Sequence, residues 1–289
     1  MVHFHKNKYG RELLIDCGRM EDKNSQFIIN HNPFVVDFHE IFMITSGKGS
    51  FRLDEQSVEF GPGTVMFMPP RKTRQWTRLE GDVKGYVLIF EEEFIADYFR
   101  DTLFLYRFHF FYDLNSPFFL HLDRKEMADM EHSLSQIQLE LTSLQSDSDH
   151  LLRSILYFVL IRFNRMYQEQ FQVAGQFFDN TLALRFRKML SNKIKTHQKV
   201  GEYADLLQVS KSHLNKILKT AIGMSTSELI KERLLSEVKR ELLFTDKTIS
   251  EIGFDFQFSD PSNFIRFFRE LSKETPREYR LRHQKPSGE

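Results

Sequence analysis

A ten-residue pattern occurs twice in the last third of the chain, and its basic residues could bind the phosphates of a nucleic acid. The two copies are Ser210–Lys219 and Asp260–Arg269. Each copy begins with a favourable helix N-cap residue and carries apolar residues at its fifth, eighth and ninth positions, which would form one buried helix face. The cations at the seventh and tenth positions fall outside that face. These cations are Lys216, Lys219, Arg266 and Arg269. Two surface helices of a bundle would explain a single copy, whereas the repetition favours paired readers of a nucleic-acid groove.

The segments around both copies predict the helices that would position them. Residues 200–207 form a short amphipathic segment, and Gln208 begins a turn in front of the first copy. Capping boxes open a long helix at Ser225 and another short helix at Thr248. A short helix, a tight turn and a helix with a basic exposed side make up the helix-turn-helix plan. Residues 181–282 would therefore contain this plan twice, joined by one long helix.

The charges are distributed unevenly along the chain. Residues 181–289 hold 21 Lys+Arg against 14 Asp+Glu, a net charge of +7, so the overall balance of zero leaves −7 on residues 1–180. A basic back half fits a module that binds a polyanion, joined to a front half of another kind.

Cysteine usage and the apolar runs predict where the protein works. Cys17 is the single cysteine, which excludes an internal disulfide framework and a cysteine-based zinc site. The first residues lack the apolar core of a signal peptide, and no apolar run approaches the roughly 18 residues of a membrane span. We expect a cytoplasmic protein with no membrane partner.

The front of the chain reads as short strands separated by turns. Between Gln26 and Phe90 the apolar runs are broken at Ser46-Gly-Lys-Gly, at Asp54 and at the two prolines after Met68, a pattern typical of an antiparallel sandwich or barrel. The order of Gly-Lys-Gly, a hairpin, Gly-Pro-Gly and Pro-Pro resembles a cupin jelly roll over residues 27–90.

The expected barrel could enclose one small ligand. Candidate lining residues are His39, Arg74, Trp76 and Tyr86. For each of them the alternative is an ordinary place in the core, in a strand or on the surface. Metal-binding cupins carry a cluster of histidines, and only His39 stands at the corresponding positions here. We therefore predict no metal, no other cofactor and no enzymatic activity.

Two helices are predicted behind the barrel. The first follows Asp123, and its apolar residues are spaced alternately by three and four, as in a heptad seam. The seam consists of Met127, Met130, Leu134, Ile137, Leu141 and Leu144. It could pair with the same helix of a second protomer, or it could pack on the following helix, residues 149–170, within one hairpin.

The segment from Ile249 to Arg280 resembles the signature of the AraC/XylS transcription regulators. It reads Ile-x-x-Ile-Gly-Phe-Asp-Phe-Gln-Phe-Ser-Asp-Pro-Ser-Asn-Phe-Ile-Arg-Phe-Phe-Arg and ends in Thr-Pro-x-Glu-Tyr-Arg. The resemblance covers about the last hundred residues. A cupin-like domain in front and a helical hairpin between are also similar to the layout of that family.

The resemblance implies two readers that enter successive faces of the major groove. The residues it places against DNA are Lys211, Ser212, Asn215, Lys216, Lys219, Ser262, Asn263, Arg266 and Arg269. Gly253 stands where the family has Ala, and Gln257 stands where the family prefers Gly. We therefore expect either an unusual backbone angle at Gln257 or a rebuilt turn in the second motif, and a conventional turn in the first motif.

The predicted fold class is α+β with two domains: an N-terminal cupin-like β jelly roll followed by a helical hairpin, and a C-terminal all-α double helix-turn-helix domain. The expected boundaries are 1–122 for the cupin-like domain with its N-terminal arm, 123–171 for the hairpin, 172–180 for a linker and 181–289 for the DNA-binding domain. We predict a transcription regulator, an activator by analogy with the family, that binds double-stranded promoter DNA as a homodimer. A small-molecule effector and RNA polymerase are candidate partners. The alternatives are a cupin-type metal enzyme fused to a DNA-binding module and a regulator whose barrel serves only assembly.

Overall fold

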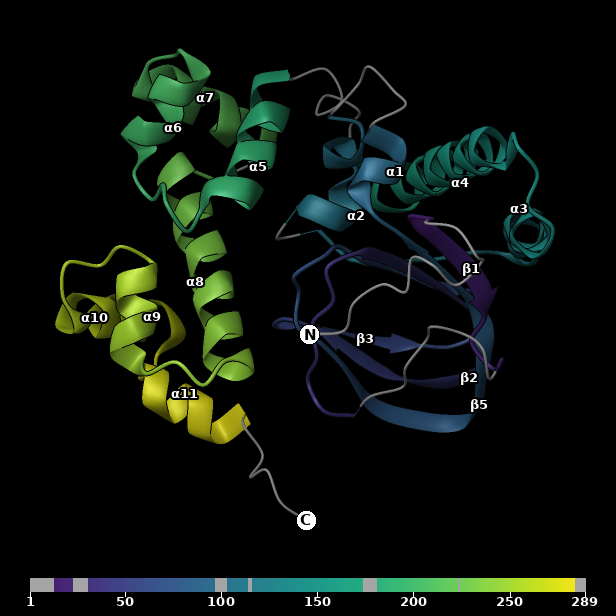
Figure 1. Cartoon of the computed structure of the whole chain (residues 1–289), viewed down its shortest axis with the longest axis horizontal. Helices are drawn as coiled ribbons and strands as arrows, with labels where there is room; N and C mark the ends of the chain where they lie inside the picture. The colour runs from purple at the N-terminus through teal and green to yellow at the C-terminus, as the bar shows by residue number, and fades with distance from the viewer. Residues whose placement is uncertain are drawn as a thin grey trace. The chain divides into compact units, whose positions relative to one another are not determined.

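Among the described residues, the first part of the chain forms a six-stranded antiparallel sheet with helices packed on it, and the second part forms seven helices (Figure 1). The computed structural model describes residues 13–22, 31–96, 103–113, 116–173, 181–222 and 224–283. The chain divides into two compact units, Met1–Gly175 and Gln176–Glu289, and each is treated by itself. The predicted N-terminal arm lies mostly outside the described residues, as do residues 174–180 of the predicted linker.

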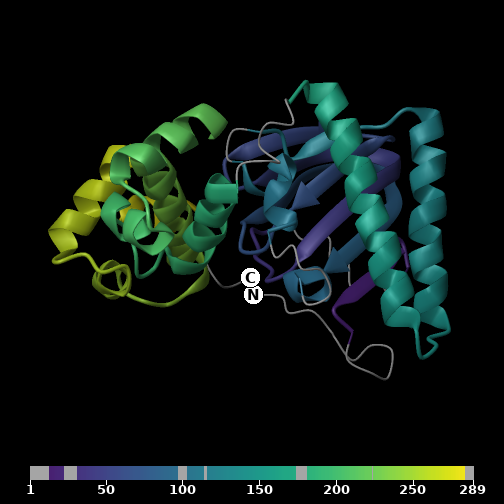
Figure 2. The same cartoon turned by 90° about the horizontal axis from the view of Figure 1, so that it is seen from above.

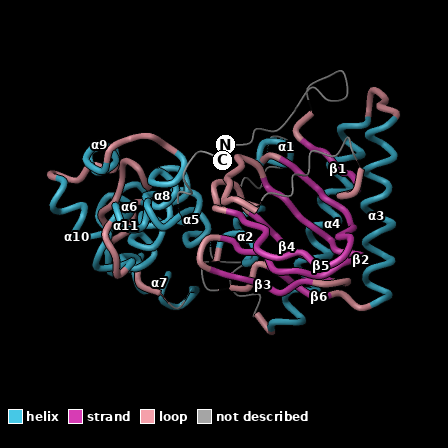
Figure 3. The backbone as a smooth tube through the Cα atoms, turned by 90° about the horizontal axis from the view of Figure 1, so that it is seen from below, coloured by secondary structure: helices cyan, strands magenta, loops and turns pink. Residues whose placement is uncertain are grey.

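The sheet of the first unit is built around two long strands. Its strands are β1 (Ile15–Arg19), β2 (His39–Leu53), β3 (Gln56–Phe60), β4 (Thr64–Met68), β5 (Arg74–Phe90) and β6 (Phe119–His121). Their order is β1-β5-β2-β4-β6, with β3 paired to β2, and every pairing is antiparallel (Figure 3). This arrangement confirms the predicted N-terminal antiparallel domain.

The predicted turn at Ser46-Gly-Lys-Gly is wrong, because β2 continues through it. The register of β2 against β5 shifts between Ile44 and Ser46 and again between Ser46 and Lys48. Gly47 adopts φ +81°, and a Cβ there would lie 2.7 Å from the Cα of Val83. Glycine at position 47 therefore allows the backbone of β5 to come close to β2 where the pairing of the two strands is irregular.

The interior of the sheet is filled by large side chains. Trp76 is fully buried, and its ring lies 4.9 Å from that of Phe51 and 5.4 Å from those of Phe42 and Phe60. Aliphatic and methionine side chains from β2, β3, β4 and β5 complete the same cluster. The abundance of Phe in the sequence thus serves the core.

Short aromatic helices cover part of the sheet. They are α1 (Glu92–Ala96), the 3-10 helix η1 (Leu105–Arg107) and α2 (His109–Tyr112). Phe110 of α2 stacks on Phe67 of β4 with ring centroids 4.0 Å apart. Phe163, from the last long helix of this unit, meets the same ring edge-on at 5.4 Å.

Two long helices, α3 (Arg124–Thr142) and α4 (Ser148–Phe171), form the predicted hairpin and lie side by side (Figure 2). Asp123 caps α3, and Glu126 completes the capping box. The heptad seam does not face outward: α3 packs on α4 and on β1, and the thiol of Cys17 donates to the carbonyl oxygen of Leu134 at 3.6 Å. Its four central residues are buried, namely Met130, Leu134, Ile137 and Leu141. The outer two, Met127 and Leu144, are half-buried.

Of the two alternatives for this seam, packing within the hairpin is the one that the structure shows, and β1 covers the seam as well. This internal packing already removes the central side chains of the seam from water.

The second unit is helical throughout, as predicted. Its helices are α5 (Thr181–Lys193), α6 (Val200–Leu207), α7 (Lys211–Ile222), α8 (Thr226–Phe244), α9 (Ile249–Asp255), α10 (Pro261–Ser272) and α11 (Pro276–His283). Reciprocal capping boxes start α8 at Ser225 and α9 at Thr248, and Asp260 caps α10. Thr275 and Glu278 exchange the same bonds before α11. None of the described helices is long and apolar enough to cross a membrane.

Candidate nucleic-acid interface

The first motif consists of α6, a tight turn and α7. The chain leaves α6 at Gln208, which takes the left-handed conformation with φ 57°. The N–H of Val209 then donates to the carbonyl oxygen of Ala204 at 3.0 Å, which closes the turn in the manner of a Schellman cap. Leu214 and Leu218 hold α7 against the rest of the unit, since both are fully buried.

The second motif, α9 and α10, repeats this geometry. Gln257 has φ 58°, so the unusual backbone angle predicted for it is confirmed. The N–H of Phe258 donates to the carbonyl oxygen of Gly253 at 3.0 Å. The expectation that only the second turn is unusual is wrong, because Gln208 holds the same conformation without glycine.

Gly253 and Ala204 occupy the same place in the two motifs, where one helix passes close to the next. A Cβ on Gly253 would lie 3.2 Å from both Cβ and Cγ of Phe264 in α10. Ala204 is 1% exposed. A Cβ on Gly253 would therefore press on the Phe264 ring of α10, and glycine avoids this tight contact.

The polar residues of α7 divide into an exposed set and one anchor. The exposed set is Lys211, Ser212, Lys216 and Lys219. Asn215 is half-buried, and its Oδ1 accepts a hydrogen bond from the backbone N–H of Thr226 at 3.0 Å. Asn215 therefore ties α7 to the start of α8, a contact between elements that sequence spacing did not reveal.

The corresponding residues of α10 form a small network at its N-terminus. Oδ1 of Asp260 accepts from the N–H of Asn263 at 2.9 Å, and Asn263 Nδ2 donates to Ser259 Oγ at 2.9 Å. Asn263 Oδ1 accepts from Arg266 Nη2 at 2.9 Å, which orients the guanidinium along the helix surface. The bond from the Asn263 N–H lowers the pKa of Asp260. Ser262, Arg266 and Arg269 are exposed.

The four candidate pocket residues do not surround one cavity. Trp76 belongs to the interior cluster together with Val87 and Ile89, whereas Tyr86 alternates with those residues along β5 and so points to the other face. Tyr86 lies at β1, where the Arg19 guanidinium sits 4.4 Å above its ring. His39 stacks on Phe90 at 4.9 Å, and its Nε2 is 2.9 Å from the hydroxyl of Tyr112.

Arg74 is a buried charge that links β5 to β2 and to the segment after β4. Its Nη1 donates to Glu40 at 2.5 Å, and its Nη2 donates to the carbonyl oxygen of Pro69 at 2.6 Å. Burial lowers the pKa of the neighbouring His39 to about 3, and the positive charge of Arg74 adds to the shift. His39 is therefore neutral in the folded protein near pH 7. Among the described residues no group of three or more His, Cys, Asp or Glu could hold a metal ion.

Comparison with known protein families gives one matching domain in each of the two units. An AraC-like ligand binding domain matches residues 29–161, and a helix-turn-helix domain matches residues 203–282. The HTH-type transcriptional activator RhaR of Mannheimia succiniciproducens is 20% identical over 273 residues, which are 90% of this chain and 95% of that protein. An uncharacterized HTH-type transcriptional regulator of Staphylococcus aureus (strain MSSA476) is 28% identical over 81 residues, 28% of this chain, and the chain spans 11% of that protein's length.

Among solved structures, ToxT from Vibrio cholerae O395 is similar with 17% identity and a TM-score of 0.44, covering 92% of this chain and 96% of that chain. An AraC-type regulator from Chromobacterium violaceum is similar with 24% identity and a TM-score of 0.33, covering 37% of this chain and 95% of that chain. The two matched domains, in the order in which the two units occur, identify the family. The chain belongs to the AraC/XylS family of transcriptional regulators.

Proposed function

We propose that this chain regulates transcription by binding promoter DNA with both helix-turn-helix motifs at once. The observation that carries the proposal is the pair α7 and α10, each set behind the same left-handed turn and each carrying exposed cations on its outer side. Such helices fit the major groove, where cations bind phosphates and Arg, Ser and Asn reach base edges. The net charge of +7 on residues 181–289 favours the approach to DNA.

Two readers on one chain would contact two short blocks of sequence about one helical turn apart. The test is a selection with the full-length chain on a pool of random-sequence duplexes. We expect enrichment of two blocks separated by about one turn of DNA. A pool that stays random after several rounds at low salt would contradict the proposal.

Activation belongs to the proposal by analogy with RhaR, whose name describes an activator. Contact with RNA polymerase is proposed as the means by which such activation would occur. The cytoplasm is the proposed location, because that is where promoter DNA is found in bacteria such as those of the named relatives. A reporter gene behind the selected duplex would rise in expression with an activator and fall with a repressor.

The first unit is proposed to act through assembly or through an effector. The filled interior around Trp76 supports assembly, whereas the match to an AraC-like ligand binding domain supports an effector. A thermal-shift screen with metabolites separates the two, since only an effector raises the melting temperature in proportion to the logarithm of its concentration.

A homodimer is proposed to form through the outer face of the hairpin rather than through the heptad seam. Leu139 of α3 and Leu151 and Phe158 of α4 are 65%, 47% and 52% exposed, and groups of exposed large apolar side chains are typical of interaction sites. Leu151 and Phe158 are seven residues apart and so share one face of α4. Sedimentation of the variant Phe158→Asp, compared with Ser57→Asp at an exposed position of β3 away from the hairpin, tests this surface. Dimers that survive Phe158→Asp would place the interface elsewhere.

A further inference from the structure

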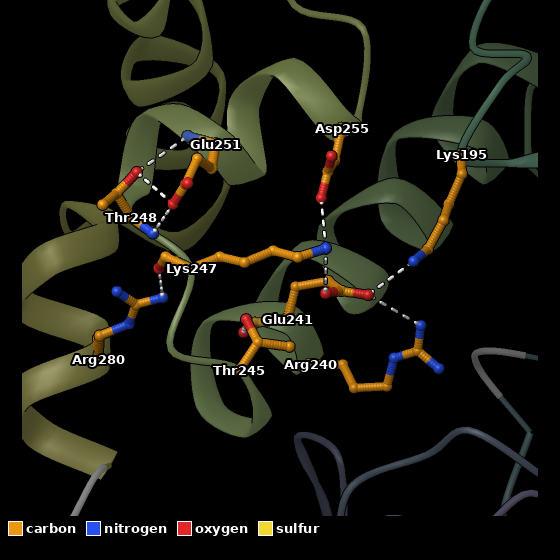
Figure 4. A network of polar contacts seen from close by, with 9 residues as sticks. All are labelled: Lys195, Arg240, Glu241, Thr245, Lys247, Thr248, Glu251, Asp255 and Arg280. Atoms are coloured by element: carbon orange, nitrogen blue, oxygen red, sulfur yellow. Dashed lines mark hydrogen bonds and ion pairs between the residues drawn. The ribbon is translucent and has the colours of Figure 1, made fainter.

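One carboxylate in the helical unit is shared by two lysines that lie in the segments directly before the two motifs. Glu241 lies near the end of α8, and its side chain is 10% exposed. Its Oε1 accepts a hydrogen bond from Lys195 Nζ at 2.7 Å, and Lys195 belongs to the turn between α5 and α6. Its Oε2 lies 3.9 Å from Nζ of Lys247, which belongs to the segment between α8 and α9. Figure 4 shows both lysines reaching the carboxylate from their separate segments.

The contact continues from Lys247 into the second motif. Lys247 Nζ donates to Asp255 at the end of α9 at 2.6 Å. Arg280 of α11 donates to the carbonyl oxygens of Lys247 at 2.7 Å and of Leu242 at 2.9 Å. The segment that carries Lys247 is therefore held on both sides, so its position follows that of the second motif.

The turn before α6 also touches the end of α9 directly. Lys195 Nζ lies 5.6 Å from the ring centroid of Phe256, which is fully buried. Gln198 Nε2 donates to the carbonyl oxygen of Phe256. The two motifs thus meet at a second place besides α8, and Glu241 supplies the negative charge there.

We propose that Glu241 is a positioning residue that fixes the spacing and rotation of α7 relative to α10. The inference rests on the proposed function, in which both helices read one duplex. α8 has 19 residues and is therefore about 28 Å long, close to the roughly 34 Å between successive turns of the major groove. The length of α8 sets the distance between the two motifs. If the motifs were attached only at the ends of α8, they could still rotate relative to each other. A second contact restricts this rotation, and a rigid link raises the effective concentration of the second reader at its site.

Loss of the carboxylate would act on this geometry rather than on folding. Lys195 and Lys247 are 46% and 45% exposed, and ion pairs of such exposed lysines add little to folding stability. Without the carboxylate Lys195 would lose its ion-pair partner, whereas Arg240 keeps Glu237 at 2.6 Å and Lys247 keeps Asp255 at 2.6 Å. The bridge between Lys195 and Lys247 would be lost, and the contact between the motifs would loosen.

The experiment measures how strictly the full-length chain requires the spacing of its two sequence blocks. The probes are the duplex recovered from the random pool, the same duplex with one base pair inserted between the blocks, and a duplex with one block only. Wild-type binding should fall about thirtyfold on insertion, because one base pair shifts and rotates the second block. Glu241→Gln should bind the original duplex about tenfold more weakly and lose only about threefold on insertion. Its binding to the single block should equal that of the wild type.

Two further variants separate the link from its surroundings. Glu274→Gln removes a carboxylate that pairs with Arg282 of α11, outside the contact around Glu241, so it should keep the wild-type requirement for spacing. Lys195→Met should lose as little binding on insertion as Glu241→Gln does. The double variant should show the same loss as either single variant, since both changes break the same ion pair.

The proposal is overturned if Glu241→Gln keeps the wild-type loss on insertion. It is also overturned if the variant loses binding to the single block as strongly as to the whole duplex, which would mean damage to one motif. A pool without any enriched duplex would overturn the proposed function itself, and that result is distinct from the other two.

Discussion

Gln208 and Gln257 stand at the same point of the two motifs with nearly the same backbone angle, φ 57° and 58°. Left-handed angles are unfavourable for residues with a Cβ, and glycine removes that cost. Both glutamine side chains are exposed. The two turns are thus equivalent in conformation, although the second is one residue longer before its helix cap, at Ser259.

The first prediction concerns these turns. Gln257→Gly should raise the free energy of unfolding of the helical unit by about 1 kcal/mol, because glycine adopts this angle without strain. Gln208→Gly should do the same. Urea unfolding followed by far-ultraviolet circular dichroism measures the change. Gln257→Val serves as the opposite control, since a β-branched residue at this angle should destabilise the unit.

A second prediction separates base reading from phosphate contact. Arg266→Ala should weaken binding to the selected duplex by about 1–3 kcal/mol and relax the preference at one base position. Lys219→Ala should weaken binding evenly across sequences and reduce the salt slope by about 1. Fluorescence anisotropy with a set of single-base variants of the duplex measures both. If Arg266→Ala weakened binding to all single-base variants of the duplex by the same factor, Arg266 would be a phosphate contact and not a base contact.

The third prediction follows from the hydrogen bond between Asn215 and the N–H of Thr226. Asn215→Ala should lower the free energy of unfolding by about 1 kcal/mol, because it leaves a donor at the start of α8 without its partner. Asn215→Asp keeps the acceptor and should retain that stability. If Asn215 also reads a base, the Asp variant should still lose DNA binding. Stability unchanged in Asn215→Ala would show that this bond is dispensable.

The fourth prediction is a pH dependence that arises from His39. Burial lowers its pKa to about 3 in the folded protein, whereas the unfolded chain takes up a proton near pH 6.5. Between these values the unfolded state binds more protons, so stability falls as the pH falls. From pH 7 to pH 5 the loss due to His39 should be about 2 kcal/mol.

The variant His39→Phe should lack this part of the pH dependence. The quantity to compare is the difference between the free energies of unfolding at pH 7 and at pH 5, since the substitution also removes the contact with Tyr112. An equal difference in wild type and variant would contradict the assignment.

The features predicted well from sequence are those that depend on neighbouring residues. The capping boxes at Ser225 and Thr248 need only residues three positions apart, and the buried faces of α7 and α10 follow from helical spacing alone. The left-handed angle at Gln257 was predictable because a residue with a side chain stands where the family prefers glycine.

The features that could not be predicted depend on distant parts of the chain. β2 continues through Gly47 because β5 offers Val83 at close range, more than thirty residues later. The seam of α3 faces inward because β1 and β5 supply an apolar surface for it. A heptad pattern records which face is apolar but not what covers it. The partners of Glu241 come from three separate segments, so no local pattern marks it.

The burial of Trp76 gives the protein a built-in optical probe. The chain has a single tryptophan, and its ring is fully enclosed by the phenylalanines of the sheet. Intrinsic fluorescence excited at the tryptophan band therefore reports the melting of the first unit only. Circular dichroism at 222 nm is dominated by helices and follows the second unit together with the hairpin. Recording both signals in one titration would reveal whether the first and the second unit unfold as separate bodies or together.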